Sequence, residues 1–435
     1  MVDAVAQPAN GKRHRGTATG RRTPTNQSPL NPRFRRLWAT FAVSSFGDGF
    51  IYGAVPLLAI VVDPRPLAVS AVVAANSLPW LLLALHAGAL SDRFERGRVM
   101  AVANVARGFV LSLMALLVGL HEMDLLALLV FVLANGSLRA IYYSASQAAV
   151  PELIAASDFN RANGVLFGTE AATENMAGPV FGSIVFSVAR AVPFLADAVA
   201  MVTSGFSLFG LRTNRPKPET DRGKLSDGLR QLFHDRNLRI LVSLIAILAG
   251  LQGLVSGVLV LVATRDWGVH ASAYGAFLAT QGAGNVLGGL LANRVAKRLG
   301  TVWTLLGSAM VSGVGYLVMA ASHSWAIAGG AFAVVGFAVG CGGVVAISLR
   351  QRLTPDRLMG RVGSAWRGIV WGAAPCGALA AGGLAILGGL RLPLLLAGVA
   401  QCVVAILLTR PVTRRLGAVD SQPKHPALDD GSGAV

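Results

Sequence analysis

The sequence predicts an all-α integral membrane protein with twelve transmembrane helices in two pseudo-symmetric six-helix bundles. Of its 435 residues, 54% are hydrophobic and only 14% are charged, whereas a soluble domain carries about 25% charged residues. Twelve apolar segments each reach the length of about 20 residues that a membrane-spanning helix needs. In addition, a basic motif after the second segment recurs after the eighth. These observations together indicate a duplicated membrane protein.

The apolar segments follow one another with mostly short connections. We expect spans over residues 36–60, 68–90, 98–119, 124–146, 160–188, 190–211, 239–263, 273–293, 302–321, 325–348, 363–387 and 389–410. Glycines four residues apart, at Gly284 and Gly288 and again at Gly336 and Gly340, predict close helix packing.

Polar stretches separate these spans into larger units. The segment 212–238 is polar and central, with Pro216 and Pro218, and it divides six spans from six. The first 32 residues lack the apolar core of a signal peptide and have the composition of a disordered tail. We therefore expect a tail over 1–32, a bundle over 33–211, a cytosolic loop over 212–238, a bundle over 239–412 and a tail over 413–435.

Basic residues gather on one side of the predicted membrane. They crowd both tails and the loops after the even-numbered spans, whereas the loops of the other side hold only Arg65, Arg190, Arg265 and Arg391. Lys and Arg mark cytosolic loops in membrane proteins. This distribution predicts a multi-pass protein of the plasma membrane with both termini in the cytosol.

The basic motif lies in the turn after the second span and has a weaker copy in the second half. It reads Gly88-Ala89-Leu90-Ser91-Asp92-Arg93, followed by Arg96, Gly97 and Arg98, and the copy carries Asn293 and Arg294 in place of Asp92 and Arg93. A second repeat, Gln-x-x-x-Pro-acid, begins at Gln147 and again at Gln351. Two parallel repeats of this kind place a substrate site near the membrane midplane, between the halves.

With this motif, residues 33–412 resemble a major facilitator superfamily transporter. The resemblance is carried by Gly88, Leu90, Ser91, Asp92, Arg93, Arg96 and Arg98. It is strongest to the drug and siderophore proton-antiporter exporters, through Phe46-Gly47-Asp48-Gly49, through 160–164 and through 193–198. The resemblance implies that Asp92 and Arg93 gate the cytosolic side against the helix that starts near Arg361. Asn293 would make the second latch weaker, because Asn caps a helix without a charge.

Ionisable side chains within membrane spans are costly and are candidates for function. Four of them are candidates for proton coupling or substrate binding: Asp48, Arg139, Glu170 and Glu174. Glu170 and Glu174 are four residues apart, so they lie on one helix face. Two carboxylates at this distance disfavour joint ionisation, so at least one of them favours its protonated form, as a proton carrier requires. The alternative is a structural network in which these acids pair with Arg139 or Arg107.

The remaining charges in the spans receive structural interpretations. Arg107 and Arg367 are placed close enough to the cytosol to extend their charges to water, and Asp197 is expected to form a bond between helices. Span five contains Gly178, Pro179 and Gly182, which match the last part of a helix motif of the exporters. The second half offers no acid within a span, so coupling must use the first half.

Other functional classes lack their sequence features. The chain has no Gly-x-x-x-x-Gly-Lys-Ser/Thr phosphate loop, no metal cluster, no nucleophile–base motif and no nucleic-acid-binding face. We expect a monomeric secondary active transporter that needs the bilayer, uses no cofactor and exports hydrophobic or amphipathic small molecules by proton-coupled alternating access. The alternatives are an uptake permease for a small nutrient and a non-transporting membrane sensor.

Overall fold

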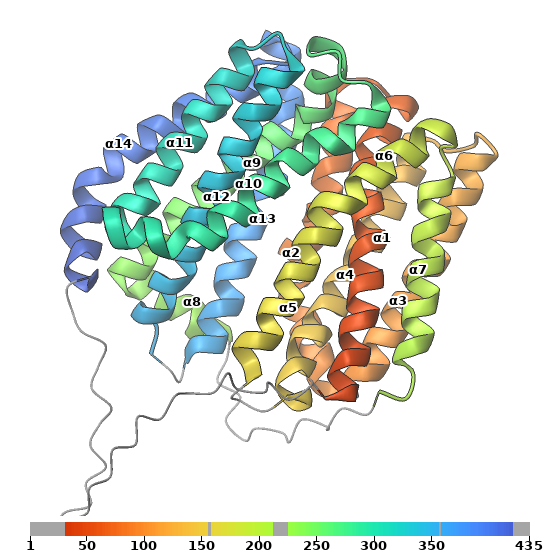
Figure 1. Cartoon of the computed structure of the whole chain (residues 1–435), viewed down its shortest axis with the longest axis horizontal. Helices are drawn as coiled ribbons and strands as arrows, with labels where there is room; N and C mark the ends of the chain where they lie inside the picture. Colours follow the sequence, from red (N-terminus) through yellow and green to blue (C-terminus); the bar gives the residue numbers. More distant parts are fainter. Residues whose placement is uncertain (1–30, 155–157, 212–224, 356–357, 421–435) are drawn as a thin grey trace, which may run out of the picture.

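The computed structural model describes residues 31–154, 158–211, 225–355 and 358–420, without the side chains of 82–93, 160, 225–227 and 416–420. Every secondary-structure element in these ranges is a helix. Figure 1 shows the helices crossing one slab, with α1 beginning and α14 ending at the same face. We call this the terminal face. The opposite face carries short turns, such as that at 63–65.

Twelve long helical segments cross the slab, which confirms the predicted fold class. The first half contains α1 (Pro32–Val62), α2 (Pro66–Arg93), α3 (Arg96–Gly119), α4 (Leu125–Leu153), a composite of α5 (Phe159–Ala172), η2 (Thr173–Ala177) and α6 (Gly178–Val188), and α7 (Val192–Leu208). The second half contains α9 (Arg236–Leu261) with η3 (Val262–Asp266), α10 (Ala271–Leu299), α11 (Thr301–Ala321), α12 (Trp325–Leu353), α13 (Met359–Gly388) and α14 (Leu392–Asp420).

Eight of the described helices are long and apolar enough to cross a membrane by length and composition alone. The other crossing segments are shorter or more polar. α7 has 17 residues, and the α5–η2–α6 segment carries Glu170 and Glu174. Polar residues in these segments mark them as candidates for the functional site.

A short helix, α8 (Leu225–His234), lies within the segment predicted as the central loop. It packs against α13, where Gly228 contacts the backbone of Arg361. Asp235 then caps α9, because its Oδ1 accepts hydrogen bonds from the backbone N–H groups of Asn237 at 2.8 Å and Leu238 at 3.1 Å. A carboxylate at this position satisfies N–H groups that the helix leaves free.

Small residues hold the helices of each half together. In the second half, Gly284 and Gly288 of α10 lie against the backbone of Ala333 and Phe337 of α12. Gly336 and Gly340 of α12 face α10 in the same way. The predicted packing of these glycines is therefore confirmed. In a bilayer, such close backbone contact replaces the hydrophobic drive that holds helices together in water.

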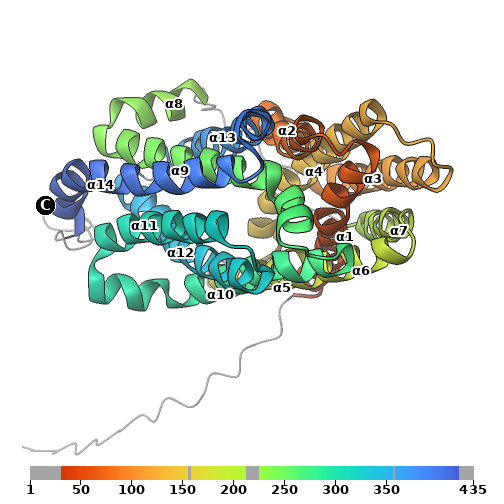
Figure 2. The same cartoon turned by 90° about the horizontal axis from the view of Figure 1, so that it is seen from above.

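The two halves lie side by side and meet along two pairs of helices (Figure 2). α2 packs against α13, and α6 with η2 packs against α10. Near the opposite face the second contact is tight: the N–H of Gly275 donates to Ser183 Oγ at 3.0 Å, and Ser183 Oγ donates to the carbonyl of Ser272 at 3.0 Å. Arg265 also donates to the carbonyl of Pro64 at 2.8 Å. These bonds close the opposite face.

Gly275→Val is expected to loosen this closure, because a side chain there would run into the carbonyl of Pro179. Overpacking costs about 1–3 kcal/mol, and about 1.4 kcal/mol shifts an equilibrium tenfold. Hydrogen exchange of the amides at 271–278 should therefore accelerate about tenfold. Gly330→Val is the matched control, since nothing lies within 4 Å of a Cβ atom at Gly330. Equal exchange in both variants would contradict this account of the closure.

Candidate functional site

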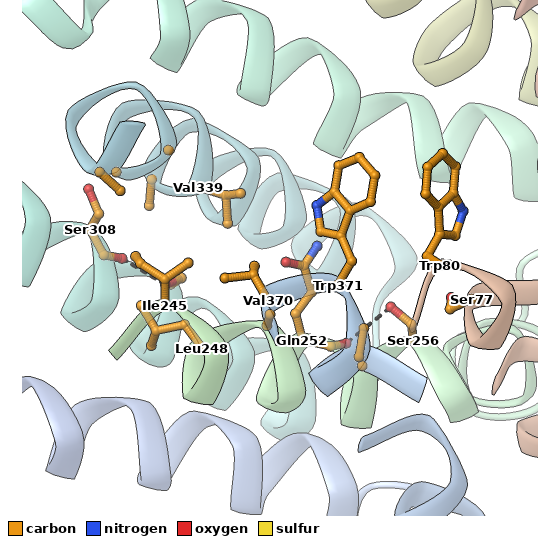
Figure 3. Close-up of a pocket in the computed structure, with 18 of the residues that line it drawn as sticks. Ser77, Trp80, Ile245, Leu248, Gln252, Ser256, Ser308, Val339, Val370 and Trp371 are labelled. Carbon is orange, nitrogen blue, oxygen red and sulfur yellow. Dashed lines mark hydrogen bonds between the residues drawn. The ribbon is translucent and has the colours of Figure 1, made fainter. Parts of the chain in front are cut away.

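A cavity of about 610 Å³ lies between the two halves. The first half lines it with α2, α4, α5 and η2, and the second half lines it with α9, α11, α12, α13 and α14. Figure 3 shows part of its wall, with Ser77 and Trp80 from α2 on one side and the residues of α9 and α13 on the other. A cavity between two repeats is where such proteins bind their substrates.

The two walls of the cavity differ in chemistry. Among the described residues, the charged side chains that line it all belong to the first half: Arg139 on α4, Glu170 on α5 and Glu174 on η2. The second half contributes apolar side chains, with neutral polar groups such as Gln252 and Ser308 among them. The cavity therefore offers one charged wall and one apolar wall with scattered hydrogen-bonding groups, which suits an amphipathic molecule.

Behind the charged wall, four side chains form a continuous ion-pair network. Arg107 of α3 pairs through Nη2 with Asp48 Oδ1 of α1, and its Nε donates to Asn135 Oδ1 at 3.0 Å. Arg139 Nε lies 3.4 Å from Asp48 Oδ2, and Arg139 Nη2 pairs with Glu174 Oε1. The network thus joins α3, α1, α4 and η2 with two positive and two negative charges.

The expected position of Arg107 is wrong. Its side chain is 0% exposed and belongs to the network, instead of reaching water at the terminal face. The position of Arg107 along α3 sets its depth in the membrane, but this depth does not determine which face of the helix points inward. Arg367 is exposed, as expected.

Glu170 lies on the cavity wall one helical turn before Glu174. Within the described part of the chain it makes neither a hydrogen bond nor an ion pair. Of the two acids that the sequence left undecided, Glu174 therefore belongs to the ion-pair network and Glu170 does not. An unpaired carboxylate beside an apolar cavity is costly when ionised, and a proton or a cationic group reduces that cost.

A π-helical turn, η2, sets the position of Glu174. It covers Thr173–Ala177 and widens the helix between α5 and α6. Such insertions are frequent at functional sites. The turn is held against α1, where Gly49 faces Gly178 and the carbonyl of Thr173 at close range. Without a Cβ atom, Gly49 lets the two backbones touch, and Glu174 reaches Arg139.

The helix motif of span five packs helices and does not line the cavity. Gly178 contacts Gly49, and Gly182 contacts the backbone of Phe50. The carbonyl of Pro179 lies against Gly53 of α1 and Gly275 of α10. These residues therefore join the first half to itself and to the second half near the opposite face.

Three aromatic rings meet where the halves face each other along the cavity. Trp80 of α2 lies with its ring centroid 4.6 Å from that of Trp371 of α13 and 5.4 Å from that of Tyr143 of α4. The centroids of Tyr143 and Trp371 are 6.2 Å apart. These edge-to-face contacts stabilise the α2–α13 interface and present aromatic surface to the cavity.

The predicted gating motif is described only in part. The side chains of Asp92 and Arg93 lie outside the described residues, and Gly88 belongs to the same stretch of α2. Arg96 pairs with Glu152 of α4 at 2.5 Å and with the carbonyl of Ala148, so it binds within its own half.

Arg98 of the first copy and two residues of the second copy lie at the surface. Arg98 lies 3.3 Å from Glu95. In the second copy, Asn293 and Arg294 are exposed near the C-terminal end of α10, at the terminal face. The gating role of both copies stays a prediction.

Two features of the site and its surroundings were not predicted from the sequence: the role of Asn135 and the environment of Asp197. Asn135, which holds Arg107, is a polar residue within a span, but such residues often bond to their own helix. Asp197 was expected to bond between helices, yet neither of its carboxylate oxygens has a partner in the described part of the chain.

Comparisons with known proteins agree with this fold. A family model described as "Transmembrane secretion effector" matches residues 25–430. The enterobactin exporter of Citrobacter koseri is 24% identical over 340 residues, which cover 77% of this chain and 81% of the exporter. An uncharacterized MFS-type transporter of Mycobacterium tuberculosis is 27% identical over 375 residues, which cover 78% of this chain and 82% of the transporter.

Two solved structures share the arrangement of helices. A bacterial homologue of the human lysosomal transporter Spinster, inward-facing and unoccupied, superposes with a TM-score of 0.71 at 13% identity, over 90% of this chain and 98% of that one. A bacterial homologue of the iron transporter ferroportin, inward-facing, gives 0.67 at 17% identity, over 86% and 98% of the two chains.

Proposed function

This chain belongs to the major facilitator superfamily, within the transmembrane secretion effectors, and from this premise we propose that it is a proton-coupled exporter of small amphipathic molecules. Its family and relatives make it a multi-pass membrane transporter and not an enzyme. We place it in the plasma membrane with both termini in the cytosol, because the terminal face carries the basic residues. It acts as a monomer, with no cofactor and no nucleic acid.

One observation carries the proposal: among the described residues that line the cavity, Glu170 is the acid without a partner, beside a network that is already neutral. The two arginines of that network balance Asp48 and Glu174, so ionised Glu170 adds one uncompensated negative charge. A proton on Glu170 removes this charge, and so does a cationic or hydrogen-donating group of a substrate. Proton and substrate therefore compete for one carboxylate, which is the basis of exchange transport.

The cavity supports entry from the terminal face. Its lining reaches Leu305, near the terminal-face end of α11, and Trp366, near that of α13. The bonds of Ser183, Gly275 and Arg265 close the opposite face. A substrate would enter from the cytosol, and a rocking of the halves about α2–α13 and α6–α10 would then expose it outside, as in alternating access.

The similarity to an enterobactin exporter favours export over uptake. We propose to express the chain in a host that lacks its own major exporters, and to measure accumulation of enterobactin and of tetraphenylphosphonium. An exporter lowers accumulation of at least one of them, and a protonophore restores it. Raised accumulation would favour the uptake permease. No change with either compound, with the protein present in the membrane, would count against the proposal.

The gating motif adds a latch to this cycle, and Asp92→Asn is expected to weaken it. A carboxylate at a helix N-terminus stabilises a contact by up to about 2 kcal/mol. Without it, the state that is closed at the cytosolic side should lose about tenfold in population. Efflux should fall by a similar factor while the amount of protein in the membrane stays unchanged. Asn293→Ala is the matched control in the second copy, and a smaller loss is expected because Asn293 carries no charge. Unchanged efflux in Asp92→Asn would contradict the latch.

A further inference from the structure

Asp197 of α7 is a buried acid that the proposed transport cycle does not use. Its side chain is 0% exposed, and neither oxygen has a hydrogen-bond partner among the described residues. An ionised carboxylate in this situation is among the most costly groups in a membrane protein. The protonated form carries no charge and avoids most of this cost. Asp197 is therefore expected to hold a proton in this state of the protein.

Two glycines bring Asp197 against the ion-pair network. Asp197 Oδ1 occupies the space that a Cβ atom would fill on Gly47, the residue before Asp48. The carbonyl of the next residue, Ala198, would lie 3.1 Å from a Cβ atom on Gly108, the residue after Arg107. α7 thus packs directly on α1 and α3 at the level of the Asp48–Arg107 pair.

The same contact contains an unused donor. Arg107 is 0% exposed, and its Nη1 has no partner in the described part of the chain, although Nη2 and Nε are bound. A free guanidinium N–H and a free carboxylate are therefore buried at one junction of three helices. The charged groups that act on Asp197 are Asp48 on α1, Arg107 on α3, Arg139 on α4 and Glu174 on η2.

We propose that Asp48 and Asp197 share one proton, and that Arg107 pairs with whichever carboxylate is ionised. In this arrangement Asp48 lies between Arg107 and Arg139 as the carboxylate partner of both, and the proton is assigned to Asp197. When Asp48 becomes protonated, Asp197 loses its proton and Arg107 turns to it. One O–H bond breaks at Asp197 and one forms at Asp48, so the buried charge stays constant and the cost of desolvation changes little.

This shift gives α7 a part in transport that its absence from the cavity lining would not suggest. Release of Asp48 would leave Arg139 bound to Glu174 alone and would tie α3 to α7 in place of α1. The inference rests on the proposed proton coupling. It is tested without substrate, so that its failure is distinct from a failure of the exporter assignment.

The test is infrared spectroscopy of the purified full chain in lipid vesicles, read at the carbonyl band of a protonated carboxylic acid. Glu170→Gln serves as the parent, so that Glu170 does not contribute. At neutral pH the parent should show a band that Asp197→Asn loses. Asp48→Asn should lose it as well, because Arg107 then pairs with an ionised Asp197. A band that persists in either variant would overturn the proposal.

Arg107→Gln covers the case in which Asp48→Asn does not fold. Without Arg107, an ionised Asp197 has no cation to pair with, and Asp48 and Glu174 already outnumber the one remaining arginine. The band of Asp197 should therefore persist at a more alkaline pH than in the parent. A band that disappears at the same or a lower pH would contradict the sharing of one proton. Elution as a single species in size-exclusion chromatography is the folding control for each variant.

Discussion

Glu170→Gln is expected to abolish proton-driven accumulation of substrate and to weaken substrate binding, while some exchange of substrate down its own gradient, independent of pH, remains. A glutamine keeps the size and hydrogen-bonding of the protonated acid, so the cavity and the neighbouring network stay in place. It cannot release a proton, and the competition between proton and substrate is lost. With one proton exchanged per substrate, a gradient of about one pH unit supports about tenfold accumulation, and this ratio should fall to unity.

The measurement uses vesicles that contain the purified protein, with radiolabelled tetraphenylphosphonium or enterobactin and an imposed pH gradient. Glu122→Gln is the matched control, because Glu122 is an exposed acid in the turn between α3 and α4. It should accumulate substrate as the wild type does. Accumulation by Glu170→Gln equal to that of Glu122→Gln would remove Glu170 from the coupling mechanism.

Arg139→Gln is expected to lower transport at least about 100-fold, because it leaves the buried Asp48 and the partly buried Glu174 without their common partner. Arg139 is the residue that joins Asp48 to Glu174. Breaking a buried pair by removing one partner costs about 3–5 kcal/mol, which corresponds to more than a hundredfold in an equilibrium. The two acids would take up protons or repel each other, and η2 would lose its attachment to α4.

Two further variants separate the network from a general effect of charge. Arg367→Gln makes the same substitution at an exposed arginine outside the network and should transport as the wild type does. Arg139→Gln is also expected to lower the thermal stability. Combined with Glu174→Gln, it removes both partners of the pair and should recover part of this loss, since paired residues show non-additive effects. Normal transport by Arg139→Gln, or no recovery in the double variant, would contradict the structural account of the network.

Much of the fold could be predicted because a membrane-spanning helix can be recognised from its local amino-acid composition. A bilayer requires runs of apolar residues of nearly fixed length, and Arg and Lys mark one side. The membership of Asp48, Arg139 and Glu174 in one polar site was accessible for the same reason, since ionisable groups in a span are rare and need partners.

The pairing within the site could not be predicted. It depends on the rotation of each helix about its axis, and in the fifth segment the π-turn at Thr173–Ala177 changes that rotation. No pattern of apolar residues signals this turn. The position of Arg107 was predicted wrongly because the rotation of α3 turns its side chain toward Asp48. The lack of a partner for Asp197 could not be predicted either, because it depends on how closely α7 packs on Gly47 and Gly108.

The central claim is that proton and substrate exchange at the cavity carboxylate. It is tested most directly by adding tetraphenylphosphonium or enterobactin to the purified protein in nearly unbuffered detergent solution at neutral pH, with a pH-indicator dye. The account predicts proton release that saturates together with binding in the wild type, and weaker binding without this release in Glu170→Gln. Saturable binding to the wild type with no proton release, or equal release from Glu170→Gln, would contradict it.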